Sequence, residues 1–238
     1  MRAPYGLNIL DNCHACPVRE KHLFCDLPTR AVQRLNEITA PAIYPAGALL
    51  FLEGQVPRGV FVVCTGRVKL LTRSSDGKTL IIRISRSGDV LGLAAVVLDR
   101  RYEVTAEMME PGQANFILRE SFMQFVREEP GVVLRVAAEL SRSYYSTFEG
   151  IRNLGLAASP TERFARLLLC WSDTTAQIDP ARPCKLSLTQ SEIAELIGTT
   201  RETVSRLFAR FKEERLLALE GATLVLRDRA ALQRIVHC

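Results

Sequence analysis

Two segments near the C-terminus place apolar residues at helical spacing, and a glycine lies between the segments. The apolar positions, three and four residues apart on one face of each segment, are Ile193, Leu196 and Ile197, then Val204, Leu207, Phe208 and Phe211. Ala194 and Gly198 suit a tight turn between packed helices, because alanine permits close contact and glycine accepts a positive φ. The pattern predicts a helix-turn-helix.

Polar residues mark the starts of both predicted helices. Thr189 and Glu192 are spaced as in a capping box, and Thr200 is placed to cap the second helix. Side chains at the N-terminal end of a recognition helix reach base edges in the major groove of DNA. The candidate DNA-binding residues are Thr189, Gln190, Thr200, Arg201, Glu202, Ser205 and Arg206. The alternative is an ordinary helical hairpin with a charged outer face.

Residues from about 40 to 119 form short β-branched runs separated by glycine-containing turns. The clearest example is GVFVVCTGRVKLLTR, then Asp76-Gly77, then KTLIIRIS, which predicts a hairpin because Asp-Gly is a strong two-residue turn signal. Strands at this regular spacing predict a closed antiparallel β-roll. A short helix is expected over residues 28–38, through Val32, Leu35 and Ile38.

A long helix is expected after Pro130. Residues three and four residues apart give it the a/d seam of a coiled coil. The predicted dimer interface is Leu134, Ala137, Ser141, Tyr144, Phe148 and Ile151. The alternative is a helix packed on its own roll. Ser159-Pro160-Thr161-Glu162 then starts another helix, which places a hinge at residues 157–159. Near the C-terminus, LLALEGATLVLRD predicts a β-hairpin wing that turns at Glu220-Gly221.

The expected fold class is α+β, with four parts in order. Residues 1–27 form a cysteine-containing N-terminal segment, and residues 28–129 form the β-roll sensor domain. Residues 130–156 form a dimerisation helix, and residues 157–238 form a winged helix-turn-helix domain that binds DNA.

Composition restricts the function further. The 238 residues are 47% hydrophobic and 24% charged, and the formal net charge of +5 permits association with nucleic acid. No segment reaches the roughly eighteen consecutive apolar residues of a membrane span, so we expect a cytoplasmic protein with no membrane partner. No enzymatic activity is expected, because there is no P-loop and the three histidines have no setting that indicates a catalytic triad.

Roll, long helix, hinge and winged helix-turn-helix, in this order and at these lengths, resemble the CRP/FNR family of bacterial transcription regulators. The resemblance is sharpest in RETVSRLFARFKEERLLALEG and in GVFVVCTGRVKLL. It implies that the roll is of the cyclic-nucleotide-binding type, a double-stranded β-helix. It also implies a homodimer that pairs through the long helix, reads a palindromic operator in double-stranded DNA and contacts RNA polymerase.

The resemblance does not extend to the nucleotide ligands of the cyclic-AMP-binding branch. There, a Gly-Glu pair after a Gly-Asp turn binds the ribose, and an Arg-Ser pair further along binds the phosphate. This chain has Gly92 but then Leu93, and Tyr102 and Glu103 lie where the Arg-Ser pair is expected. The loss of a charged partner costs several kcal/mol in a buried site. We therefore expect no response to cyclic AMP.

The FNR-like branch instead holds an iron–sulfur cluster with three N-terminal cysteines and a fourth in the roll. Cys13, Cys16 and Cys25 have the spacing C-x2-C-x8-C, and they are the candidate metal ligands. Asn115 lies about where the fourth cysteine is expected. Cys64 is the only cysteine of the roll, and a buried free cysteine there would behave as a small hydrophobe. Asp11, His14 and Asp26 are further candidates to complete the site.

Three interpretations of the N-terminal cysteines stay open. They bind an iron–sulfur cluster that responds to oxygen or nitric oxide, or they form a thiol redox switch or zinc site. In the third, the cysteines are structural or vestigial, and the β-roll binds a small ligand, either a cyclic nucleotide or another compound. The other cysteines, to which we assign no role, are Cys170, Cys184 and Cys238.

Overall fold

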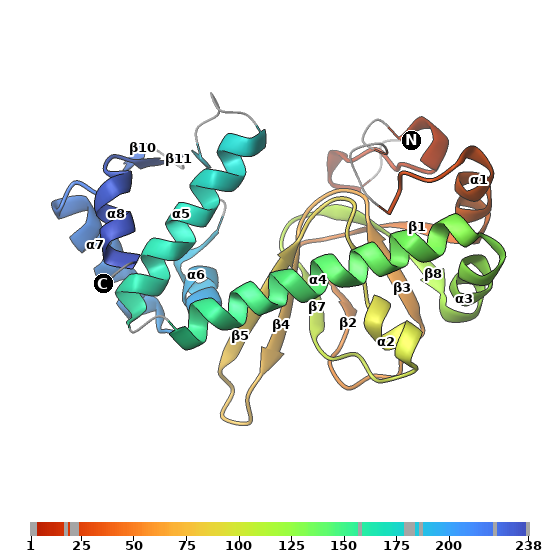
Figure 1. Cartoon of the computed structure of the whole chain (residues 1–238), viewed down its shortest axis with the longest axis horizontal. Coiled ribbons are helices and arrows are strands. Elements are labelled where there is room, and N and C mark those ends of the chain that lie inside the picture. The colour runs from red at the N-terminus through yellow and green to blue at the C-terminus, as the bar shows by residue number, and fades with distance from the viewer. Residues whose placement is uncertain are drawn as a thin grey trace. The chain divides into compact units, whose positions relative to one another are not determined.

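The structure, a computed structural model, describes residues 4–16, 19, 24–156, 159–178, 184–185, 188–220 and 223–236. It divides into two compact units, Met1–Thr147 and Phe148–Cys238, and each unit is treated by itself (Figure 1).

The first unit contains short helices, eight strands and the start of a long helix. In chain order these are η1 (Pro4–Gly6), η2 (Cys13–Ala15), α1 (Thr29–Ile38), β1 (Thr39–Tyr44), β2 (Leu49–Phe51), β3 (Gly59–Val63), β4 (Val68–Arg73), β5 (Thr79–Ser85), β6 (Val90–Leu91), α2 (Leu93–Leu98), β7 (Thr105–Met108), β8 (Gly112–Leu118), α3 (Arg119–Glu128) and α4 (Pro130–Leu156).

The strands form two four-stranded antiparallel sheets, ordered β1-β8-β3-β6 and β2-β7-β4-β5. Apolar side chains from both sheets fill the space between the sheets, as alternating inward-facing residues do in a roll. Members of this inner cluster are Phe51, Phe61, Val63, Val68, Leu70, Leu91, Ala106, Met108 and Ala114. The predicted antiparallel β-roll is confirmed.

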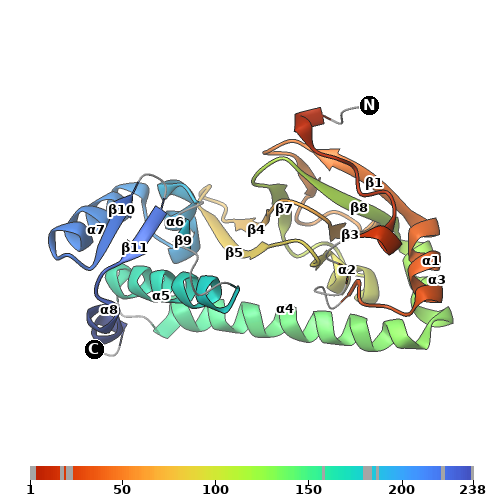
Figure 2. The ribbon, with the colours of Figure 1, turned by 90° about the horizontal axis from the view of Figure 1, so that it is seen from above.

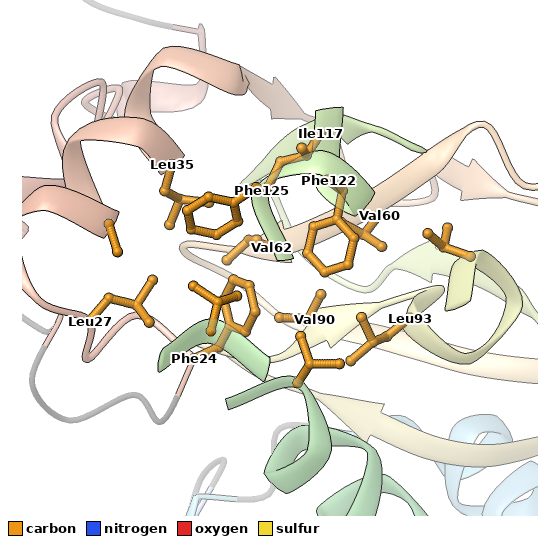
Figure 3. Packing of buried hydrophobic residues seen from close by; sticks show 14 of the residues in the cluster. Phe24, Leu27, Leu35, Val60, Val62, Val90, Leu93, Ile117, Phe122 and Phe125 are labelled. Carbon is orange, nitrogen blue, oxygen red and sulfur yellow. The ribbon is translucent and has the colours of Figure 1, made fainter. Parts of the chain in front are cut away.

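A second apolar cluster covers the outer face of the β1-β8-β3-β6 sheet. It joins Val60, Val62 and Ile117 of the sheet to side chains of α1, α2, α3 and the first turns of α4. Figure 3 shows that Phe24 and Leu27, from the segment before α1, enter the same cluster. The cysteine-containing N-terminal segment is therefore built into the core of the roll.

The second unit contains the helix-turn-helix and its wing (Figure 2). Its elements are α5 (Pro160–Ile178), β9 (Cys184–Lys185), α6 (Gln190–Ile197), α7 (Arg201–Glu213), β10 (Leu217–Glu220), β11 (Thr223–Leu226) and α8 (Arg229–Val236). The wing is a three-stranded antiparallel sheet ordered β10-β11-β9. Phe164 and Leu168 of α5 pack against Phe208 and Phe211 of α7 and anchor the core of this unit.

Several details differ from the sequence prediction. The hairpin at Asp76-Gly77 does not have a two-residue turn: Arg73 pairs with Thr79, so five residues separate the strands. Ser74 closes this loop by accepting a hydrogen bond from the backbone of Lys78 at 3.1 Å. The short elements α2, α3, α8 and β9 were not predicted. Gly221 of the wing turn and residues 157–158 of the hinge lie outside the described residues.

Within the described part of the chain, no helix is long and apolar enough to cross a membrane.

Candidate DNA-binding surface and cysteine site

The helix-turn-helix has the local geometry that its sequence predicts. The hydroxyl of Thr189 accepts a hydrogen bond from the backbone of Glu192 at 3.2 Å, and the Glu192 carboxylate accepts one from the backbone of Thr189 at 2.7 Å. Gly198 has a φ of 61°, and its N–H donates to the carbonyl of Ala194. A side chain at this left-handed position would be strained, which explains the glycine.

Helix α7 separates an apolar face from a polar one. Thr200 caps the helix by accepting a hydrogen bond from the backbone of Thr203 at 3.3 Å. The apolar face, Val204, Leu207, Phe208 and Phe211, is buried. The predicted contacts at the start of α7 are all exposed: Arg201, Glu202, Ser205 and Arg206. In α6, Thr189 is exposed and Gln190 is half-buried. The start of α7 therefore offers a compact polar surface.

Glu202 is held in its charged form. Its own backbone N–H, then the Thr200 hydroxyl, donate to the carboxylate and lower the pKa of Glu202 below its usual value. The ionised side chain is an acceptor at neutral pH, next to the guanidinium groups of Arg201 and Arg206. One carboxylate acceptor and two cationic donors can therefore approach base edges together.

The long helix α4 has two different faces. Val132, Val136 and Glu139 are buried, and the two valines belong to the outer cluster of the roll. The six predicted seam residues are all exposed: Leu134, Ala137, Ser141, Tyr144, Phe148 and Ile151. Leu134 is 75% exposed. The helix therefore packs on its own roll through its opposite face, as the alternative predicts, and the residues of the predicted seam are exposed.

Four cysteines from three separate segments line one cavity of about 40 Å³. Cys13 and Cys16 come from the end of the N-terminal segment, Cys25 precedes α1, and Cys64 follows β3. Asn115 of β8 lines the same cavity. The structure thus places Cys64 in the same cavity as the three predicted ligands. Nothing in the sequence around Cys64 indicates that it would lie near them.

The other candidate ligands do not line this cavity. Asp26 instead accepts an ion-paired hydrogen bond from Arg135 of α4 at 2.7 Å, and neither Asp11 nor His14 borders the cavity. Among the described residues, no three His, Cys, Asp or Glu side chains are close enough together to hold one ion. The thiols therefore share a cavity without forming a preassembled centre.

Burial favours the neutral form of three of these thiols, those of Cys13, Cys25 and Cys64. It raises the pKa of Cys25 to about 12, and the thiols of Cys13 and Cys16 raise this pKa further. The pKa of Cys64 is raised to about 12, first by burial and then by Cys25, and burial also raises the pKa of Cys13. Arg19 lowers the pKa of Cys13 and Cys25, but its effect is smaller than that of burial. A neutral thiol is a poor nucleophile, so the metal-free set is protected from oxidation.

Two amide side chains, Gln113, which is buried, and Asn36, which is half-buried, hold the segment that carries the first two cysteines. Gln113, 1% exposed, donates to the carbonyl of Leu10 at 2.7 Å and accepts from its N–H at 2.7 Å. Asn36 of α1 accepts a hydrogen bond from the backbone of Cys13 at 3.1 Å. Sequence reasoning missed both residues, because a single amide side chain in a strand or helix gives no pattern that marks such a partner.

Leu93 and Tyr102, two of the positions at which nucleotide ligands were expected by resemblance, are packed among apolar side chains, whereas Glu103 is exposed. Leu93, 4% exposed, belongs to the outer cluster. The ring of Tyr102 stacks on Phe51 with centroids 4.0 Å apart, and its hydroxyl donates to the carbonyl of Gly59 at 2.6 Å. A Cβ on Gly92 would come within 2.7 Å of the Tyr102 ring, so this position has no room for a side chain.

The two units define a class of protein, a regulator with a nucleotide-binding type of roll and a winged helix-turn-helix. Residues 42–129 match the cyclic nucleotide-binding domain, and residues 162–235 match the Crp-like helix-turn-helix domain. The chain belongs to the CRP/FNR family of transcription regulators. As the sequence predicted, these proteins are regulators and not enzymes.

Individual relatives agree with this assignment. The chain is 24% identical over 184 residues to the cAMP-activated global transcriptional regulator CRP of Pasteurella multocida, covering 77% of this chain and 88% of the relative. FixK2 from Bradyrhizobium japonicum has a TM-score of 0.72 at 23% identity, covering 83% and 97% of the two chains. The c-di-GMP responsive regulator CLP of Xanthomonas campestris has a TM-score of 0.74 at 20% identity, covering 84% and 100%. These structural likenesses establish the fold.

Proposed function

We propose that this protein is a homodimeric, DNA-binding regulator of the FNR-like branch, and that its signal enters through the cysteine cavity. One observation carries the proposal: Cys13, Cys16, Cys25 and Cys64, from three segments, line a single cavity. The sequence provided three ligands and no clear fourth. Cys64 supplies the missing thiol from the end of β3, and it borders the same cavity as Asn115.

The donor set fits an inorganic group. Four cysteines are the usual complement of an iron–sulfur cluster, and they also suit a structural zinc ion. The cavity volume of about 40 Å³ exceeds the roughly 10–15 Å³ that a single water molecule needs. When bound, an iron–sulfur cluster would supply reactivity toward oxygen or nitric oxide, whereas zinc would supply no redox chemistry. We favour the cluster over a free-thiol switch, because burial raises the pKa of both Cys25 and Cys64 to about 12 and so disfavours the reactive thiolate.

Residues 24–27 connect the cavity to the dimerisation helix. Cys25 lines the cavity, and the residues on both sides of it face away toward the roll and α4. Phe24 stacks on Phe122 of α3 with centroids 6.3 Å apart, in the cluster that also contains Val132 of α4. Asp26 pairs with Arg135 of α4 at 2.7 Å. A displacement of Cys25 toward the other thiols would therefore act directly on α4.

The exposed seam of α4 is the proposed dimer interface. A row of apolar and small residues at a/d spacing, exposed on one protomer, matches the self-complementary face of a two-fold coiled coil. Pairing through α4 would place two recognition helices about one helical turn of DNA apart, as an inverted repeat requires. In each half-site we expect Arg206 to read a guanine and Glu202 the amino group of a cytosine. RNA polymerase is the expected protein partner, and the cytoplasm the expected location.

The alternative function is a regulator that binds a small ligand in the roll, with structural or vestigial cysteines. Cyclic AMP does not suit this role, because Leu93 and Tyr102 fill the nucleotide positions with apolar contacts. Metal analysis of the protein purified without oxygen separates the two functions.

Replacing Cys64 tests the fourth ligand. Wild-type protein purified without oxygen is expected to contain iron and sulfide and to show a charge-transfer absorption band. The Cys64→Ser variant should lose most of the bound metal, because a hydroxyl is a poor ligand for iron or zinc. Cys170→Ser, at an exposed site on α5, is the control and should retain the metal. Full metal content in the Cys64 variant would place the fourth ligand elsewhere, and metal-free wild type would refute the proposed cofactor.

Replacing Arg135 tests the connection to α4. The Arg135→Gln variant should bind metal as wild type does. In wild type, operator affinity should differ between metal-loaded and metal-stripped protein. In the variant this ratio of affinities should be roughly fivefold smaller, a factor at the lower end of typical coupling between two sites. Arg34→Gln removes an ion pair between α1 and α3, 2.6 Å from Glu128, and is the matched control. Unchanged coupling in the Arg135 variant would exclude the ion pair as a route to α4.

Replacing Ile151 tests the dimer interface. Ile151→Glu would bury two unpaired carboxylates across a two-fold axis, which costs several kcal/mol. Sedimentation should detect a monomer, and operator binding should be lost. The control Arg152→Glu introduces the same side chain one residue away, off the seam, and should remain a dimer. A dimeric Ile151 variant would mean that the interface lies elsewhere.

Replacing Arg206 tests base recognition. Arg206→Ala should weaken operator binding by about 1–3 kcal/mol and relax selectivity at one base pair in each half-site. Arg210→Ala, further along α7, removes an exposed arginine and should leave selectivity unchanged. Binding to the operator and to random DNA is measured at one salt concentration. Equal losses on both DNAs would show that Arg206 contacts only phosphate.

A further inference from the structure

A second, larger pocket opens where the two sheets of the roll meet. Strands β1 and β2 are the edge strands of their sheets, and in the described residues no backbone ladder joins them. The pocket between these edges has a volume of about 430 Å³, within the usual range for small-molecule sites. None of the four clustered cysteines lines this pocket.

Aromatic rings form the walls of the pocket. Phe61 lies at the centre, 4.9 Å from Phe116, 6.0 Å from Phe51 and 6.5 Å from Tyr44 between ring centroids. The Tyr44 ring meets Phe61 edge-on, at 73°, and Tyr102 stacks on Phe51. Phe51, Phe61 and Tyr102 are largely buried against one another, whereas the rings of Tyr44 and Phe116 are half-buried and can meet a further planar ring. Each favourable aromatic contact would add to the energy of burial.

The polar groups of the pocket are hydrogen-bond donors. Arg58 is exposed and forms no ion pair in the part of the chain that the structure describes. The carbonyl of the Gln55 side chain already accepts from the backbone of Leu52, which leaves the amide N–H groups to donate. The hydroxyl of Tyr44 has no hydrogen bond among the described residues, and burial raises its pKa, so it stays protonated at neutral pH. No carboxylate lines the pocket, and its one formal charge is positive.

The pocket differs from the nucleotide positions of the roll. Leu93 and Glu103 do not line it. Tyr102 lines the pocket, but its hydroxyl already donates to the carbonyl of Gly59. Aromatic walls, three donors and a single positive charge define a site for a planar anion.

We infer that this pocket, lined by Tyr44, Phe61 and Arg58, binds an aromatic monocarboxylate. The ring would lie against Phe61 and Phe116, and the carboxylate would accept hydrogen bonds from the guanidinium of Arg58 at the mouth. The inference does not depend on the cysteine cavity or on the proposed function.

Calorimetry on the full-length protein tests the site with 2-naphthoate and its neutral analogue 2-naphthamide. The acid should bind at least tenfold more tightly than the amide, because only the acid forms a charge-assisted pair. In Arg58→Gln this difference should vanish, while Arg73→Gln, which removes an exposed arginine at the end of β4, should preserve it. Ala42→Trp, on the β1 edge that lines the pocket, should abolish binding of both compounds by filling the space.

Three results would overturn the inference. The first is that the acid and the amide bind equally well, or that neither compound binds, in which case the pocket would be left to a protein partner. The second is that Arg58→Gln and Ala42→Trp retain wild-type affinity for both compounds, which would mean that the compounds bind elsewhere. The third is that cyclic AMP displaces 2-naphthoate, which would mean that the pocket is the nucleotide site of the family.

Discussion

The burial of residues 24–27 against the outer face of the β1-β8-β3-β6 sheet is the constraint on which the cysteine cavity depends. Phe24 is fully buried, and truncation of such a side chain typically costs about 3–5 kcal/mol. This packing fixes the backbone around Cys25, while the Gln113 amide fixes the segment that leads to Cys13. Two distant parts of the N-terminal segment are thus held on one sheet, and the cavity lies between the points of attachment. The cysteine cavity and the apolar cluster on this sheet are therefore parts of a single packed unit.

The same burial determines the chemistry of the thiols. Val32, Leu35 and Val62 contribute apolar walls to the cavity, and Arg19 is its only cationic side chain among the described residues. In such surroundings a thiolate has little to stabilise it, and the pKa values of Cys13, Cys25 and Cys64 are raised accordingly. A bound metal ion would therefore place a large charge in surroundings that otherwise disfavour one.

Sequence reasoning succeeded where structure is determined locally. The capping box of Thr189, the turn at Gly198 and the exposed seam of α4 depend on residues within one or two helical turns, and the structure shows all three features. It was less informative where strands from distant parts of the chain meet. Cys64 reaches the cavity because β3 pairs with β8, and Gln113 binds a backbone group 103 residues away. Neither contact has a periodic signature, so three of the cavity's cysteines were predicted from spacing and the fourth was not.

The packing of Tyr102 also limits how this roll could change its effector during evolution. The ring rests on Phe51 and covers Gly92, while Leu93 belongs to the apolar cluster on the other side of the sheet. A glutamate at position 93 alone would bury a charge without a partner, and an arginine at position 102 alone would break the stack and the hydrogen bond to Gly59. Each single step toward nucleotide recognition lowers stability before any ligand can compensate. With this core, the introduction of nucleotide ligands at positions 93 and 102 would therefore require several substitutions together.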